Sequence, residues 1–262
     1  MPNSLVCNIE YLPAREALLI QLDMSEYLID YYIHRGEFAS ETTPEQDQKL
    51  KELIACFAVH LGMHRATQSH AWTLHMISDP PFSLFVTGAI DALGEGTSDG
   101  GYLVGNVLTD HIRHTDVNSF HAQFTDSVGQ SFKSYVQSES GDVAQVVEHF
   151  YRQSEQQPLR IALSGTNDTA VALAALPGYD QSWFESAELD ALSNDQTEQK
   201  KPMRTLRFNF ACDCSPEKLL PFFRSIPSAS VDELYGVDEE LVIICPRCAK
   251  SFRIPRGDIK EE

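Results

Sequence analysis

The sequence lacks any long apolar run, and its basic side chains are few. No stretch approaches the roughly 18–20 consecutive apolar residues that a membrane helix needs, so we expect no membrane partner. The chain holds 20 Lys and Arg against 38 Asp and Glu, a net charge of −18. Residues 1–200 carry this excess, with 28 acidic and 10 basic side chains. A surface this acidic repels phosphate backbones, so we expect no nucleic-acid partner.

Motifs of common enzymes are also missing. There is no Gly-x-Ser-x-Gly nucleophile elbow and no phosphate-binding Gly-Lys-Ser/Thr loop. His60 and His64 lie four residues apart on an expected helix, but a metal site there needs a third ligand. We interpret both as histidines at a surface or domain edge, and His111 and His114 likewise. The sequence therefore predicts a protein that is not an enzyme, with no catalytic residues and no organic cofactor.

Cysteine is sparse, and its distribution is uneven. The first residues show no basic stretch followed by an apolar run, so we expect a cytoplasmic protein, in which disulfide frameworks are rare. Cys7 and Cys56 stand alone and are expected to be plain thiols, Cys56 buried beside Ile54 and Phe57. The other four cysteines fall within 37 residues near the C-terminal end: Cys212, Cys214, Cys245 and Cys248.

Patterns in the first two thirds of the chain predict a mixed helical and β domain. Thr43-Pro44 with Gln46 is a helix-start signature, and apolar residues at helical spacing extend the helix over 44–65. Short alternating segments between 71 and 137 predict a mostly antiparallel sheet, with turns at Gly94, Gly96 and Gly100-Gly101. A second helix is expected over 142–156, capped by Asp142 and followed by a strand at 160–163.

The predicted fold class is α+β with three parts. Residues 1–184 form the core domain, residues 185–206 a polar linker with few core-forming side chains, and residues 207–262 a small four-cysteine module. Within that module, Ser215-Pro216 and the capping box from Ser230 to Glu233 predict two short helices. Two apolar strands then flank the last cysteine pair, which places it at the tip of a hairpin.

The four clustered cysteines have the spacing of a zinc site. Zn²⁺ favours four tetrahedral thiolates supplied as two close pairs, and Cys245-Pro-Arg-Cys248 fits a zinc knuckle. Cys212-Asp-Cys214 is a less usual pair on an extended segment. Three interpretations remain open from the residues alone: a permanent structural zinc site, two structural disulfides, or a thiol switch in which oxidation releases the metal. A nucleic-acid ribbon is a weaker alternative, because ordinary solvated charge explains the basic residues of the hairpin.

Two separate segments together resemble one known family. The first runs from Phe210 through the four cysteines to Asp258-Ile259, with 30 residues between the two pairs. The second contains Gly141-Asp-Val and ends in Ser154-Glu155-Gln156-Gln157-Pro158. Both resemble the 33 kDa chaperonin family (heat-shock protein 33), the redox-regulated holdase chaperones. Gly100-Gly101-Tyr102 stands where that family has Arg-Gly-Tyr, and the segment before Cys212 is shorter, so we interpret the chain as a diverged member.

The resemblance implies a specific function. In the reduced, inactive state the four cysteines would bind one Zn²⁺ per chain. Oxidation would form the disulfides Cys212–Cys214 and Cys245–Cys248, release the zinc and unfold the module with its linker. The exposed surface would then hold unfolding client proteins without ATP, and the oxidised chain could form a homodimer. The alternative function is that of a non-enzymatic binding or regulatory protein whose four-cysteine zinc module is purely structural.

Overall fold

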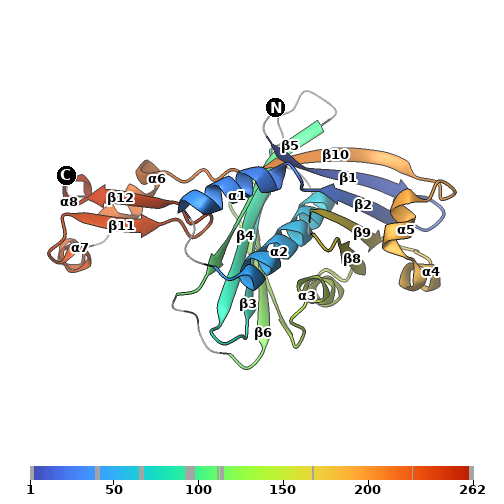
Figure 1. Ribbon diagram of the computed structural model, residues 1–262, viewed down its shortest axis with the longest axis horizontal. Helices are drawn as coiled ribbons and strands as arrows, with labels where there is room; N and C mark the ends of the chain where they lie inside the picture. Colours follow the sequence, from blue (N-terminus) through green and yellow to red (C-terminus); the bar gives the residue numbers. More distant parts are fainter. Residues whose placement is uncertain are drawn as a thin grey trace.

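The computed structural model describes residues 3–38, 42–64, 68–91, 98–110, 112, 115–166, 168–225 and 227–259. Its body is built on one ten-stranded sheet, and a smaller unit with its own hairpin projects from it (Figure 1). The strands of the large sheet are β1 Ser4–Leu12, β2 Ala17–Asp23, β3 Ser69–Met76, β4 Phe82–Asp91, β5 Ser98–Leu108, β6 Asn118–Thr125, β7 Ser131–Ser138, β8 Leu159–Leu163, β9 Thr169–Ala175 and β10 Lys201–Asn209.

The strand order in the large sheet is β7-β6-β3-β4-β5-β10-β1-β2-β9-β8. Neighbouring strands of the described chain pair antiparallel, except β10 and β5, which run parallel. The mostly antiparallel sheet predicted between residues 71 and 137 is thus confirmed, with β6 as a strand that the sequence pattern missed. The predicted α+β class is confirmed as well.

Helix α2 (Pro44–Met63) packs against β4 and β5 and provides much of the core. Its start is the predicted capping box: Thr43 Oγ1 accepts from Gln46 N–H at 3.2 Å, and the Gln46 side chain accepts from Thr43 N–H at 2.9 Å. The predicted apolar stripe of this helix is buried: Leu50, Leu53, Ile54, Phe57 and Leu61. The prediction of this helix is therefore confirmed, and none of the described helices is both long and apolar enough to span a membrane.

Helix α3 (Val143–Phe150) lies beside α2 and leads into a single π-helical turn, η1 (Tyr151–Glu155). Asp142 caps α3, since its side chain accepts from Gln145 N–H at 2.9 Å. The turn ends at Gln156, whose φ of 55° is left-handed. The predicted helix over 142–156 is therefore confirmed in extent, although its last turn is π-helical.

The glycine pair at residues 100–101 is not the predicted turn but part of β5. A Cβ at Gly101 would meet the Ala89 carbonyl oxygen at 2.3 Å, so glycine here allows a close approach between strands. The sequence pattern could not separate this use of glycine from a turn. The predicted turn at Gly94 and Gly96, and the prediction for His111 and His114, lie outside the described residues.

The range predicted as a polar linker contains more structure than expected. Helix α5 (Leu189–Asn194) buries Leu189 and Leu192, and β10 inserts between β5 and β1 of the sheet. The two leucines stand three residues apart, which is enough to bury one face of this short helix. The domain boundaries at 184/185 and 206/207 stay a prediction.

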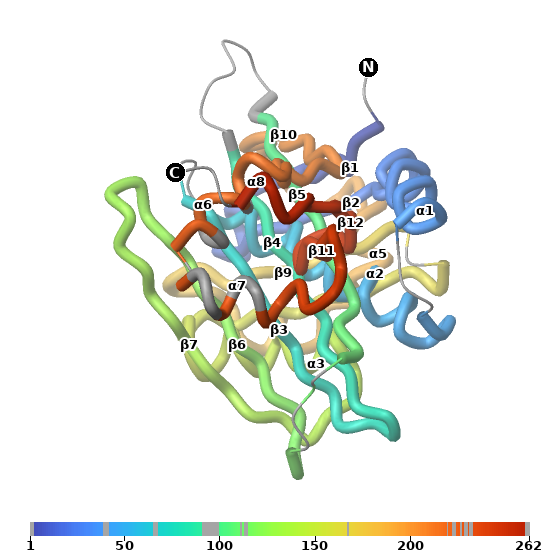
Figure 2. Tube along the Cα trace, turned by 90° about the vertical axis from the view of Figure 1, so that its left-hand side faces the viewer, coloured from blue at the N-terminus to red at the C-terminus, as the bar shows by residue number. Residues whose placement is uncertain are grey.

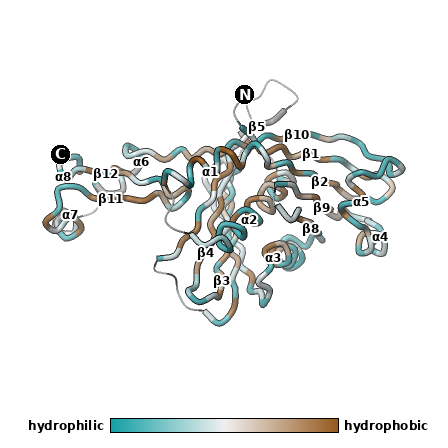
Figure 3. Tube along the Cα trace, in the orientation of Figure 1, coloured by the Kyte–Doolittle hydropathy of each residue, from teal (hydrophilic) through white to brown (hydrophobic). Residues whose placement is uncertain are grey.

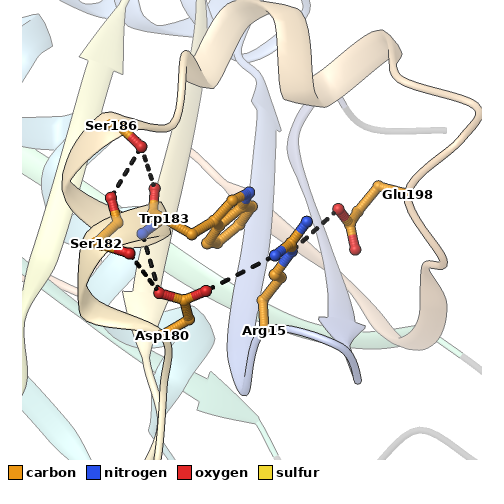
Figure 4. Close-up of polar contacts among 6 residues, drawn as sticks. All are labelled: Arg15, Asp180, Ser182, Trp183, Ser186 and Glu198. Atoms are coloured by element: carbon orange, nitrogen blue, oxygen red, sulfur yellow. Dashed lines mark hydrogen bonds and ion pairs between the residues drawn. The ribbon is translucent and has the colours of Figure 1, made fainter.

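Polar contacts also fasten this range to the body (Figure 4). The guanidinium of Arg15 lies 3.3 Å from Glu198 and 3.8 Å from Asp180, and it stacks over the Trp183 ring at 4.8 Å. Trp183 belongs to α4 (Gln181–Ser186), which Asp180 caps by accepting from Trp183 N–H at 3.1 Å. Arg15 thereby joins the turn between β1 and β2 to both ends of the segment 180–198.

The projecting unit is called the tail here and comprises the described residues from 210 to 259. It contains α6 Pro216–Arg224, α7 Ser228–Tyr235, β11 Glu240–Ile244, β12 Ser251–Pro255 and α8 Arg256–Ile259. Both predicted helices are present, although α7 begins at Ser228, two residues before the predicted cap at Ser230. The predicted hairpin is confirmed, with β11 and β12 paired antiparallel. Figure 2 views the molecule from the tail end, with the tail in front of the sheet, and Figure 3 shows the hydrophobic character of β11.

Candidate metal centre

Two parts of the tail bring the four cysteines together. Cys212 and Cys214 lie on the extended segment between β10 and α6, and Cys245 and Cys248 lie in the tight turn between β11 and β12. Two backbone hydrogen bonds close that turn: Cys245 N–H donates to the Lys250 carbonyl at 2.8 Å, and the Ala249 amide donates to the Cys245 carbonyl at 2.9 Å. The turn therefore holds both of its cysteines at the tip of the hairpin, as predicted.

The four sulfur atoms form one group. All lie within 4.8 Å of one another, with Sγ–Sγ distances of 3.9 Å for Cys212–Cys245 and 3.6 Å for Cys214–Cys248. Four thiolates bound tetrahedrally at about 2.3 Å from one Zn²⁺ stand roughly 3.8 Å apart, whereas a disulfide brings two sulfurs to about 2.05 Å. The observed separations suit a shared metal ion, and these four residues could hold one.

Hydrogen bonding among the thiols separates their acidities. The contact with Cys212 lowers the pKa of Cys245, and the same contact with Cys245 raises the pKa of Cys212. One thiol keeps its proton and donates it to the other sulfur, which is thereby stabilised as a thiolate. Four sulfurs this close cannot all be thiolates without a cation among them, so the donor set favours a bound dication over the free thiols.

Among the tail side chains that the structure describes, the buried apolar groups are small. Cys245 and Cys248 are each 3% exposed, and Phe252 packs against the sulfurs. A second small cluster joins Tyr235, Ile254 and Ile259, and the Tyr235 hydroxyl donates to the Ile254 carbonyl at 3.0 Å. Within the described part of the tail these are two groups of three buried residues, so a metal ion at the cysteines would contribute a large part of its stability.

The cysteine turn also contacts the body through α1 (Tyr27–Phe38). His34 Nε2 lies 2.6 Å from the Cys248 carbonyl oxygen, and Lys250 Nζ sits 5.6 Å from the centre of the Phe38 ring. Phe210, just before the first cysteine pair, packs edge-on against Tyr27 and Tyr31 at 5.7 and 5.9 Å. Sequence patterns did not indicate His34 or the contact of Phe210 with α1, since only folding brings the two segments together.

A surface depression of about 800 Å³ lies between α3, β8 and α5 and gathers several titratable side chains. Two of them already have structural partners. Glu148 accepts from the Ile161 amide at 2.7 Å, and Arg160 donates to the carbonyls of Phe184 and Ala187. These contacts place Glu148 and Arg160 in the packing of β8 and α4 rather than in an arrangement of nucleophile and base.

His60 is buried, which corrects the expectation that it lies at a surface or domain edge. His60 is 4% exposed and His64 is partly buried, and both lie against His70 of β3. The helix end that carries them faces the sheet, whereas the polar character of histidine suggested that they would be exposed to solvent. His70 was missed because nothing in its local pattern shows that β3 passes the end of α2.

Residues 116–255 match the sequence model of a family described as Hsp33 protein, which is more than half of the chain. The chain belongs to the Hsp33 family. Among its Hsp33 relatives, a 33 kDa chaperonin of Lactobacillus delbrueckii subsp. bulgaricus is 23% identical over 224 residues, covering 72% of this chain and 75% of the relative. The 33 kDa chaperonin of Shewanella loihica is 21% identical over 157 residues, covering 52% and 55%.

A crystal structure of the 33 kDa chaperonin (heat shock protein 33 homolog) from Thermotoga maritima has the same fold. It superposes with a TM-score of 0.72 over 98% of this chain and 97% of that chain, at 12% sequence identity. The resemblance stated from the two sequence segments is confirmed, and the low identities fit a diverged Hsp33 protein. Membership of this family makes the chain a chaperone.

Proposed function

We propose that this protein is a redox-regulated, ATP-independent holdase whose switch is the four-cysteine cluster of the tail. One observation carries the proposal: four sulfurs from two distant segments lie within 4.8 Å of one another, at separations that fit a single ion. In the reduced state Cys212, Cys214, Cys245 and Cys248 would hold one Zn²⁺ and keep the tail folded. The bound ion supplies cross-linking and keeps the sulfurs as reactive thiolates.

Oxidation would convert the ligands into disulfides. For each pair, peroxide accepts two electrons from two thiolates and two protons from the solvent, one S–S bond forms, the O–O bond breaks, and two waters leave. The pairing Cys212–Cys214 and Cys245–Cys248 follows the family resemblance. The two Sγ–Sγ contacts that we measure each join a cysteine of one pair to a cysteine of the other pair. Every sulfur nevertheless has the other three within 4.8 Å. Disulfide sulfurs bind zinc poorly, so the metal would leave.

Loss of the metal would unfold the tail because the apolar clusters that the structure describes in it are small. Structural zinc contributes about 10–16 kcal/mol in zinc-finger peptides near pH 7, which exceeds what two clusters of three residues provide. Unfolding would withdraw Phe210 and the Cys248 carbonyl from α1. Both contacts join the cysteine segments directly to the body. The oxidation state of the sulfurs would thereby determine how much of the α1 surface is exposed.

The surface that would be uncovered is apolar. Helix α1 already exposes Ile29 and Tyr32 by 50% each and Ile33 by 64%, next to the tyrosines that Phe210 covers. Removing the tail would enlarge this patch, and large exposed apolar patches are typical of surfaces that bind other proteins. Unfolding client proteins are therefore the proposed partners, and a second oxidised copy of the chain is another ligand for the same patch.

The experiment measures zinc release and suppression of client aggregation, before and after peroxide at elevated temperature. We expect the reduced protein to bind one zinc per chain at these cysteines and to suppress aggregation weakly. After oxidation that zinc should be free in solution and aggregation of a thermally unfolding client should fall several-fold. Cys214→Ser should lose the metal without oxidant, whereas the matched control Cys56→Ala, in the body, should behave as the unmodified protein.

Zinc that stays bound through oxidation, with no gain in holding activity, would favour the alternative of a purely structural zinc module. Zinc release without any gain would separate the metal site from chaperone activity and reject the switch. A reduced protein that holds clients fully would also contradict the proposal, since the tail would then not cover the binding surface.

A further inference from the structure

We propose a second metal site, in the body, formed by His60, His64 and His70 and suited to a divalent transition-metal ion such as Zn²⁺. Each histidine offers one ring nitrogen, and the three nitrogens lie within 4.8 Å of one another. The site shares no residue with the cysteine cluster and does not depend on the redox switch.

The fold brings the three imidazoles to one point. His60 lies in the last turn of α2, His64 is the residue that follows the helix, and His70 lies in β3. The ring centres are 4.1 Å apart for His60 and His64, 4.7 Å for His60 and His70, and 4.8 Å for His64 and His70. The interplanar angles of 49°, 78° and 48° show that no two of the three rings stack in parallel.

Hydrogen bonds already orient His60 for metal binding. Its Nδ1 lies 2.6 Å from the Tyr151 hydroxyl, and its Nε2 lies 2.9 Å from His70 Nδ1. When Nδ1–H donates to the Tyr151 oxygen, the Nε2 lone pair points at His70. Such an outer partner on the second ring nitrogen is the common support of a metal-bound histidine. Two nitrogens bound to one ion at about 2.0–2.1 Å stand roughly 3.3 Å apart. The nitrogens of His60 and His70 therefore need to move apart only slightly to admit an ion.

One observation shows that the hydrogen-bonding groups of the cluster are not all satisfied by packing. His70 Nε2 is buried and has no hydrogen-bond partner within the part of the chain that the structure describes. Whichever proton arrangement links Tyr151, His60 and His70, this nitrogen remains unpaired, and an unpaired buried polar group is costly. His70 therefore retains a ring nitrogen whose hydrogen-bonding capacity the described packing leaves unused.

All three rings are held neutral, which is the form that binds metal. Burial lowers the pKa of His60 well below its ordinary value, and it lowers the pKa of His64 and of His70 to about 4. The surroundings are aromatic: Phe57 and Trp72 lie against His60, and Phe124 lies against His70. Protonation is therefore disfavoured here, while the ring lone pairs stay available.

One charge opposes a cation at this site. Arg204 donates to the carbonyls of Gly62 and His64 at the end of α2, and its charge contributes to the lowered pKa of His64. The partial negative charge at a helix C-terminus offsets part of this repulsion. Three neutral imidazoles with an arginine nearby should bind zinc less tightly than four thiolates, so we expect the histidine site to lose its metal first to a weak chelator.

The test counts zinc in the full-length reduced protein after gel filtration with Zn²⁺ as the only added metal. We expect two zinc ions per chain, one in His64→Gln and two in the matched control His149→Gln, whose ring is outside the cluster. Peroxide should reduce the unmodified protein from two ions to one and His64→Gln from one to none. Tyr151→Phe should keep the fold and weaken the histidine site by roughly 10–100-fold in affinity, by removing the support of His60.

The outcomes separate this site from the proposed switch. The unmodified protein could bind only one zinc per chain, lose it to peroxide and keep it in His64→Gln. That result would overturn the histidine site and leave the proposed switch intact. One zinc that persists through oxidation and is lost in His64→Gln would establish the histidine site and reject metal binding by the cysteines. If His64→Gln were poorly folded by circular dichroism, the affinity of Tyr151→Phe for Zn²⁺ would decide: an unchanged affinity would contradict the site.

Discussion

The six cysteines of this chain occupy two unlike environments. Cys7 and Cys56 are fully buried in the body, and burial raises the pKa of Cys7 to about 12 and that of Cys56 well above its ordinary value. The prediction from sequence that Cys56 is buried is confirmed. Thiolate is the reactive form of cysteine, so neither body thiol is suited to sense an oxidant. The two body cysteines thus differ from the four tail cysteines because of where they lie in the fold.

This difference predicts selective alkylation. After removal of metal under reducing conditions, iodoacetamide at pH 8 should modify the four tail cysteines and leave Cys7 and Cys56 unmodified in the native protein, as measured by peptide mass spectrometry. At that pH a thiol with a pKa of about 12 is almost entirely protonated. Modification of Cys7 at the rate of the tail thiols would contradict the assignment.

Glycine at position 101 offers a test of packing at the same scale. Gly101→Ala would place a Cβ 2.3 Å from a backbone oxygen, which the sheet can relieve only by moving a strand. We expect a loss of about 1–3 kcal/mol in the free energy of unfolding, measured by urea denaturation. Gly100→Ala is the matched control, because its nearest neighbour would be 3.8 Å away, and it should lose far less.

At the scale of elements, side-chain caps mark where helices α2 and α3 begin. The cap of α3 predicts that Asp142→Ala lowers the free energy of unfolding by about 1 kcal/mol, because the Gln145 amide loses its acceptor. Asp142→Asn keeps an acceptor of similar reach and should be close to neutral. Equal losses in the two variants, measured by thermal unfolding, would show that the cap contributes nothing.

The contact between α1 and the cysteine turn is the element that links the tail to the body. His34→Ala removes the partner of the Cys248 carbonyl and should loosen the docking of the tail. We expect a several-fold faster release of zinc by peroxide and faster proteolysis within residues 210–259, since one hydrogen bond contributes about 1 kcal/mol. His149→Ala, on α3 and away from this contact, should show neither change.

Sequence patterns predicted elements whose signals are local. The capping box of α2, the Asp142 cap of α3 and the hairpin around Cys245 and Cys248 all depend on neighbouring residues, and each is confirmed. The site was predictable to the same extent: two cysteine pairs at suitable spacing indicate one metal, although the metal itself stays a proposal. Contacts across the fold were not predictable, because the insertion of β10 between β5 and β1 and the approach of β3 to α2 depend on topology.

At the scale of the whole molecule, stability is divided unequally. The body has one large apolar core beneath its ten-stranded sheet, whereas the described side chains of the tail form two small clusters, one of which contains Cys245 and Cys248. A chelator strong enough to strip the cysteine site should therefore unfold the tail and leave the body folded, without any oxidant. Limited proteolysis should then cut within residues 210–259 while the remaining fragment keeps its thermal transition; loss of both together would contradict this division.

Hydrogen–deuterium exchange of the full-length protein, followed peptide by peptide before and after peroxide, tests most directly whether the sulfurs keep the tail folded. In the reduced protein the backbone amides of β11 and β12 should be protected. After oxidation they should exchange at the rate of an unfolded chain, together with new exposure at α1, while β3 and β4 keep their protection. Protection of β11 and β12 that survives complete oxidation of the four cysteines would contradict the account.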